Sequence, residues 1–124
     1  MKLSKNFNLS EFESKDGSET PPEVVENLKE LSQNLQILRD YIGGVSIQIN
    51  SGYRSPEHNR EVGGAKNSQH LYGKAGDIVV KPFTPKDIKT IIEELISNGK
   101  IKEGGLSAYN TFVHYDIRGT KARW

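Results

Sequence analysis

The hydrophobic period of this chain changes abruptly at one glycine pair, and that change constrains the fold more than any other feature. Between Pro22 and Gly43, apolar residues recur every three or four positions, which is the spacing of one helix face. These residues are Val25, Leu28, Leu31, Leu35 and Leu38. After Gly43 and Gly44, apolar and polar residues alternate from Val45 to Asn50, the pattern of a half-buried strand. A long amphipathic helix followed directly by such a strand is typical of the α+β class.

Further elements are expected at short intervals along the rest of the chain. Ser55 and Thr84 are each followed by proline, and both are favoured residues for capping a helix. The expected ranges are 56–62 for a short helix, 85–98 for a longer amphipathic helix, and 75–80, 105–109 and 111–117 for strands. Together these elements predict a small, mainly antiparallel sheet packed against the two longer helices.

The first 20 residues are expected to form an arm that ends in a polar loop. Phe7, Leu9 and Phe12 are the side chains expected to pin this arm to the core. At 124 residues the chain has the length of one domain, and it can bury about two-thirds of its unfolded surface. We therefore expect a single domain over 1–124.

Composition excludes several classes of protein. The chain has no cysteine, which rules out disulfides, Cys-ligated zinc and thiol nucleophiles and leaves His, Asp and Glu as metal ligands. The mean hydropathy is −0.64, and no run approaches the roughly 20 apolar residues of a membrane span. Lys and Arg number 17 against 16 Asp and Glu, so no basic excess favours nucleic acid as a partner.

Two histidines and two aspartates are the candidate residues for a metal site, although their spacing alone is a weak signal. His70 lies in a polar loop, and Asp77 follows it beside an apolar run, where a carboxylate is costly to bury unless a cation or hydrogen bonds compensate it. Capping of the loop is the alternative role for Asp77. In the strand 111–117, period 2 places His114 and Asp116 on one face. This pair suits a metal ligand and its neighbour, or else a solvated His–Asp pair. His58, among polar residues, is adequately explained as a solvated side chain.

Three motifs occur in order along the chain. The segment SGYRS occupies 51–55, the pattern S-x-H-x-x-G-x-A-x-D runs from Ser68 to Asp77, and His114 lies in a late strand. In this order they resemble the LAS zinc peptidases, the D-alanyl-D-alanine carboxypeptidase family, whose zinc-site architecture hedgehog domains share. The similarity extends over most of the chain and is greatest to the compact phage and bacterial branch. It includes FNLSEF at 7–12, GGAKNSQH at 63–70 and FVHYDIRG at 112–119.

The resemblance implies a zinc ion on the open face of the sheet, held by His70, Asp77 and His114 with water in the fourth position. Three nitrogen and oxygen ligands with one open position are the coordination of catalytic rather than structural zinc. Arg54 matches the family's arginine, whose implied role is to stabilise an oxyanion or hold the substrate; a surface salt bridge is the alternative. The implied substrate-binding residues are Arg54, Tyr53 and Ser68.

The general base is where this chain departs from the family pattern. Many members carry Glu or Asp three residues before the last zinc ligand, but Thr111 occupies that position here and cannot take a proton at neutral pH. Asp116 is the first substitute as a catalytic residue because it shares a strand face with His114, and orienting His114 is its alternative role. Weaker candidates near the Arg54 loop are Glu57, His58 and Glu61.

The implied function is a zinc metallopeptidase that hydrolyses peptidoglycan stem peptides next to a D-amino acid by attack of zinc-bound water. Such an enzyme would be a D-Ala-D-Ala carboxypeptidase or an endolysin-type endopeptidase of cell wall degradation. A module that binds zinc and wall peptide without hydrolysis is the second hypothesis, because Thr111 replaces the acid. A non-haem Fe(II) oxygenase also uses two His and one carboxylate. That group usually separates its first His and its acid by one residue, whereas His70 and Asp77 are seven positions apart.

Partners and location follow from the same reasoning. The expected partner is the peptidoglycan stem peptide, and the protein is expected to be a monomer that neither binds nucleic acid nor spans a membrane. The N-terminal segment lacks the apolar stretch of about 7–15 residues that a secretory signal carries. We therefore expect the protein to be cytoplasmic as synthesised and to act at the cell wall after release or export.

Overall fold

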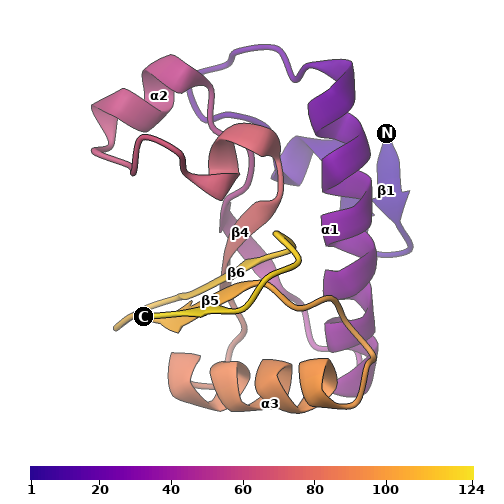
Figure 1. The fold of residues 1–124 in the computed structure, drawn as a ribbon. Coiled ribbons are helices and arrows are strands. Elements are labelled where there is room, and N and C mark those ends of the chain that lie inside the picture. The colour runs from indigo at the N-terminus through magenta and orange to yellow at the C-terminus, as the bar shows by residue number, and fades with distance from the viewer.

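A computed structural model describes residues 1–124, which form three helices and seven short strands (Figure 1). The helices are α1 (Pro22–Tyr41), α2 (Pro56–Glu61) and α3 (Pro85–Ser97), with 3₁₀ turns η1 (Leu9–Glu11) and η2 (Gln69–Tyr72). The strands are β1 (Lys2–Ser4), β2 (Phe7–Asn8), β3 (Gln48–Ser51), β4 (Ala75–Val79), β5 (Gly105–Ala108), β6 (Val113–Asp116) and β7 (Ala122–Arg123). The predicted α+β class is confirmed.

Five of the strands form one sheet in the order β3-β4-β6-β5-β7, and β1 pairs with β2 in a separate hairpin. All neighbours in the larger sheet are antiparallel except β5 and β7, which run parallel. The sheet therefore brings β4 and β6 side by side at its centre, although α3 and β5 separate them in the chain. None of the three helices is both long enough and apolar enough to cross a membrane.

The two longer helices begin and end where local sequence signals place them. Pro22 lies in the first turn of α1, and Gly43 and Gly44 follow its end with φ of 88° and 84°, a left-handed conformation that favours glycine. Thr84 and Asp87 form a capping box at the start of α3. The buried face of α1 includes Val24 rather than the predicted Val25, which is only partly buried.

A core of 21 buried residues joins α1, α3, the sheet and the arm. Phe7 and Phe12 are at most 1% exposed and pack with their ring centres 5.9 Å apart, and Leu9 packs against the core from outside. The arm is also held by polar contacts, since the Asn6 backbone N–H donates to Gln36 of α1 at 2.8 Å. Burial of each large apolar side chain stabilises the fold by about 1.5–3 kcal/mol, so the arm is part of the core.

Several local predictions differ from the structure, and the strand β7 was not predicted. The strand expected from Val45 begins at Gln48, although Ile47 is buried as its alternation predicts. The arm contains the β1–β2 hairpin, and the polar stretch 65–73 contains η2; neither was predicted. Both are short elements without a hydrophobic period, so sequence pattern alone does not reveal them.

Candidate metal centre

The pairing of β4 with β6 places two of the predicted metal ligands directly opposite each other. Asp77 faces His114 in the register, while the next pair, Ile78 and Val113, belongs to the core on the other face of the sheet. The third predicted ligand, His70, comes from η2. Its backbone N–H donates to Ser68, and Gly73 ends the turn with φ of 73°. The three side chains are buried, with exposed fractions of 2%, 7% and 8% for His70, Asp77 and His114.

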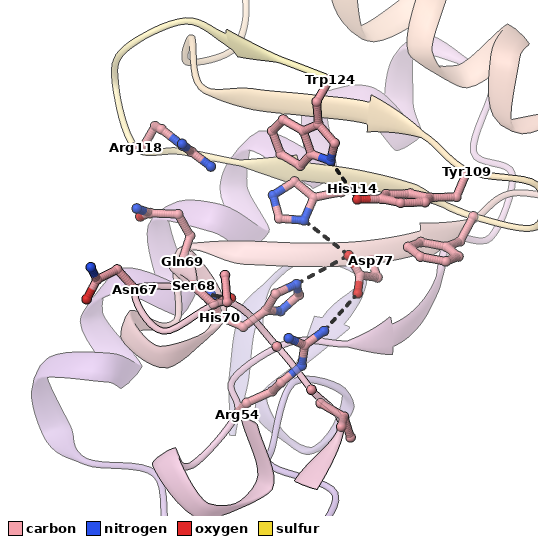
Figure 2. Close-up of a pocket in the computed structure, with 15 residues that line it drawn as sticks. Arg54, Asn67, Ser68, Gln69, His70, Asp77, Tyr109, His114, Arg118 and Trp124 are labelled. Carbon is pink, nitrogen blue, oxygen red and sulfur yellow. Dashed lines mark hydrogen bonds and ion pairs between the residues drawn. The ribbon is translucent and has the colours of Figure 1, made fainter. Parts of the chain in front are cut away.

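Three potential ligand atoms converge at this point, as Figure 2 shows. The Asp77 Oδ1 lies 3.3 Å from His70 Nε2 and 3.3 Å from His114 Nδ1, and all three atoms lie within 4.8 Å of one another. In a tetrahedral zinc site with ligand distances of about 2.0–2.1 Å, neighbouring ligand atoms are about 3.3–3.4 Å apart. The spacing of Asp77 to both histidines therefore fits a zinc ion.

Each histidine ring is held by its second nitrogen, which fixes the tautomer. His70 Nδ1 donates to the Gly52 carbonyl at 2.7 Å, because a carbonyl oxygen can only accept. On the other ring, His114 Nε2 donates to the Asp116 carboxylate at 2.7 Å. In the neutral rings, His70 Nε2 and His114 Nδ1 therefore present lone pairs to the Asp77 carboxylate. Three acceptors cannot satisfy one another, so the cluster requires a proton or a cation at its centre.

The charge of the cluster also suits a cation. Burial acts to raise the pKa of Asp77, but the His114 and His70 rings, which donate to its carboxylate when they are protonated, outweigh burial and hold that pKa well below its ordinary value. Asp77 is therefore ionised at neutral pH. Burial acts to lower the pKa of His114, yet the bonds to Asp116 and Asp77 raise it. Without a metal, a proton on His114 satisfies part of the cluster; a divalent cation satisfies all three ligands.

The predicted Arg54 lies beside the cluster and contacts its carboxylate. Its Nη2 is 3.3 Å from the second oxygen of Asp77, and its other nitrogens donate to Ser51 and Asn59, both at 3.2 Å. Asn59 is buried, and its amide donates to the Ala65 carbonyl at 2.9 Å. Sequence reasoning missed Asn59, whose contact with Arg54 appears only once the loop before α2 has folded.

Asp116 lies behind His114, away from Asp77. It is completely buried and also accepts hydrogen bonds from Gly105 N–H at 2.7 Å and from Arg118 Nε and Nη2 at 2.9 and 2.8 Å. A Cβ at Gly105 would collide with this carboxylate, so glycine there allows β5 to approach it. Burial acts to raise the pKa of Asp116, but these bonds hold it well below its ordinary value. The geometry supports the orienting role, rather than the role of general base reached from the pocket.

A cavity of about 610 Å³ opens over the cluster. Its lining includes the three predicted ligands, Arg54 and Ser68. Aromatic side chains that sequence reasoning missed form another part of the lining. These side chains are Tyr109, Phe112 and Trp124. Figure 2 labels Tyr109 and Trp124. Asp77 is the only side-chain carboxylate in the lining. The other candidate bases Glu57, His58, Glu61 and Asp116 lie outside it, as does Thr111.

The prediction of Tyr53 as a substrate-binding residue is not supported by its position. Tyr53 is 5% exposed, belongs to the core and does not line the cavity. Its backbone N–H donates to the Phe12 carbonyl at 2.8 Å, which ties the loop before α2 to the arm. Tyr53 therefore supports the loop that carries Arg54.

Comparison with known families identifies the family of this chain. Residues 2–116 match the family described as Peptidase M15. The chain belongs to the Peptidase M15 family. The zinc D-Ala-D-Ala carboxypeptidase of Streptomyces albus G is a distant relative of this member of the family, 48% identical over 44 residues. That match covers 36% of this chain and 17% of the relative, so most of the relative lies outside the matched segment. The resemblance drawn from the three motifs is confirmed.

Proposed function

We propose that this M15 peptidase is a zinc-dependent hydrolase of peptidoglycan stem peptides that cleaves next to a D-amino acid. The observation that carries the proposal is the convergence of three lone-pair donors from His70, Asp77 and His114 beneath an open cavity. The name of the Streptomyces relative supports both the metal and the chemical class of the substrate. Because peptidoglycan lies outside the membrane, the proposal places the activity at the cell wall after release or export.

The residues around the cluster have distinct roles in this proposal. A bound zinc ion would polarise the scissile carbonyl and lower the pKa of a water molecule in the open coordination position. Arg54, a cation fixed at the edge of the cluster, would hold a substrate carboxylate or the oxygen that gains negative charge. Asp116 orients His114 through the hydrogen bond at 2.7 Å and would make its ring a better ligand.

A second function is favoured by one observation on the cavity. Its lining contains no side-chain carboxylate except Asp77, and Thr111 stands where many family members have an acid. A domain that holds zinc and wall peptide without cleaving it therefore remains the alternative to hydrolysis.

Digestion of purified peptidoglycan distinguishes the two functions. We expect the zinc-loaded protein to release fragments with new amino and carboxyl termini, detected by mass spectrometry, and a chelator to abolish their release. Arg54→Ala should retain zinc and lower the rate about 100-fold, since that is the size of effect when one stabilising donor is lost. The matched control is Arg39→Ala, which removes a partly exposed arginine of α1 outside the cavity. Peptidoglycan binding without new termini would favour the binding module, and failure to bind zinc would contradict both functions.

A further inference from the structure

A hydrogen-bonded aromatic pair lies at the edge of the metal cluster. Trp124 packs its ring against His114, with ring centres 4.9 Å apart, and its indole Nε1 donates to the Tyr109 hydroxyl at 2.6 Å. Both side chains line the cavity that opens over the cluster. Figure 2 shows the Tyr109 hydroxyl turned toward Trp124 and His114, while Arg54 approaches from the opposite side.

The indole fixes the direction of the hydrogen bond. A tryptophan Nε1–H can only donate, so the Tyr109 oxygen must accept from it. The hydroxyl proton of Tyr109 then remains for another acceptor, and the hydroxyl makes no other hydrogen bond within the protein. Tyr109 is 43% exposed, so this donor is accessible to a molecule in the cavity.

Both members of the pair are held in place before any ligand binds. Tyr109 stacks on Phe112, with ring centres 4.6 Å apart and an angle of 12° between the rings, and its backbone N–H donates to the Phe112 carbonyl at 2.8 Å. The Trp124 backbone oxygen accepts from Ser107 Oγ at 2.7 Å, and the Arg118 guanidinium lies 5.7 Å from its ring centre. A donor that is positioned in advance loses little entropy when a charged oxygen forms beside it.

We propose that the Tyr109 hydroxyl is a catalytic hydrogen-bond donor to the carbonyl oxygen of the scissile bond, and that Trp124 is its positioning residue. This inference rests on the proposed peptidase function and adds a second donor, on the side of the cluster opposite Arg54. Tyr109 lies within the segment that matches the M15 family, whereas Trp124 lies beyond it. The tryptophan contact is thus a feature of this chain rather than of the matched segment.

Steady-state kinetics on a synthetic stem pentapeptide ending in D-Ala-D-Ala tests the donor. Tyr109→Phe should lower kcat about 10- to 100-fold with KM within about twofold of the wild type, because the lost bond strengthens only as charge develops. Zinc content should be unchanged. Tyr41→Phe, which removes an exposed hydroxyl from the end of α1, is the matched control and should retain the wild-type rate.

A double-mutant cycle tests the role of Trp124. Trp124→Phe keeps an aromatic ring against His114 but removes the N–H, so kcat should fall about 3- to 10-fold in the wild-type background. In the Tyr109→Phe background the same change should have no further effect, because Trp124 acts through the hydroxyl. Equal effects in both backgrounds would overturn the positioning role.

Binding of a phosphinate peptide separates this inference from the proposed function. The analogue would mimic the bond that the peptidoglycan digestion identifies, or the D-Ala-D-Ala bond where no cleavage is found. The oxygens on its tetrahedral phosphorus resemble the negatively charged oxygen that forms when water attacks the scissile carbonyl. Tyr109→Phe should raise its Kd, measured by calorimetry, about tenfold or more. If the wild type cleaves peptide and Tyr109→Phe changes neither kcat nor this Kd, the inference is wrong and the proposed function stands. If the wild type does not cleave but Tyr109→Phe raises the Kd, the hydroxyl contacts the bound peptide without a catalytic role, and both the catalytic donor and the hydrolase proposal are wrong. If the wild type does not cleave the peptide and Tyr109→Phe leaves the Kd unchanged, the inference and the proposed function are both contradicted.

Discussion

The two histidines of the cluster are held by opposite ring nitrogens. His70 presents Nε2 and is fixed through Nδ1 by the Gly52 carbonyl, whereas His114 presents Nδ1 and is fixed through Nε2 by Asp116. The difference follows from where each residue lies, because one ring extends from a 3₁₀ turn and the other from a central strand. A neutral carbonyl and a buried carboxylate therefore complete the same kind of site.

Asp116 provides the sharpest test at this scale. Asp116→Asn keeps the size of the side chain and removes the charge that holds His114, so zinc affinity should fall about 10- to 100-fold, as for other residues that orient metal ligands. Competition with a chromophoric chelator measures this change. Asp40→Asn is the control, since Asp40 lies in α1 and accepts from Gln36 at 3.1 Å. Unchanged zinc affinity in Asp116→Asn would contradict the orienting role.

Single residues were predictable where their motif is specific. His70, Asp77 and His114 were predicted because three motifs in order carry far more information than a lone histidine, and their convergence agrees with that prediction. Tyr109 and Trp124 could not be predicted, since their contact joins residues 15 apart through the folding of β5, β6 and β7. Tyr53 was predicted to bind substrate because it belongs to the SGYRS motif, but its side chain is buried in the core.

At the scale of elements, hydrogen bonds to the arm hold the loop that carries Arg54 in place at the start of α2. Ser55 caps this helix, and its hydroxyl also donates to Asp16 in the arm at 2.6 Å. Ser14 donates to the same carboxylate at 2.7 Å and accepts from the Ser55 backbone N–H at 3.1 Å. The starts of α2 and α3 were predictable because capping signals are local. The link between Ser55 and the arm was not, because it depends on residues about 40 positions apart.

The hydrogen bonds between Asp16 and the start of α2 should make the stability of the fold depend on pH. Hydrogen bonds from Ser55 and Ser14 lower the pKa of Asp16 from its ordinary value of 3.8. A carboxyl whose pKa is lower in the folded state stabilises the fold above its unfolded pKa, and this contribution is lost as the pH falls through the folded pKa. Asp16→Asn should therefore be less stable than the wild type at pH 7, with the difference shrinking as the pH falls below 3.8. Urea unfolding at pH 7, 4 and 3 measures it; a difference independent of pH would contradict the assignment.

At the scale of the whole molecule, the core and the candidate metal centre lie on opposite faces of one sheet. The 21 core residues include none of the three predicted ligands, although Ile78 and Val113 alternate with them along β4 and β6. The hydrophobic period was sufficient to predict this core and the α+β class. The order of the strands could not be derived from it, because register and neighbour choice depend on contacts between distant segments. The fold should therefore form without metal and gain stability when metal binds.

Thermal unfolding with and without zinc tests this separation. At a free zinc concentration 100 times Kd, the folded state should gain about 2.7 kcal/mol, which raises Tm on the order of 10 °C for a domain of this size. A chelator should return Tm to the metal-free value and leave a cooperative transition. In His114→Ala the zinc-dependent increase should be largely lost, whatever the Tm of the metal-free variant. An equal increase in that variant would exclude His114 as a ligand.

The register of β4 and β6 gives the three ligands unequal freedom. Asp77 and His114 sit on paired strands, so their separation is locked to the spacing of the sheet. His70 comes from a turn that ends at a left-handed glycine, outside the sheet. We therefore expect a metal ion of larger radius to be accommodated by a shift of η2. Substitutions that change metal selectivity should then lie in and around η2 rather than in β4 and β6.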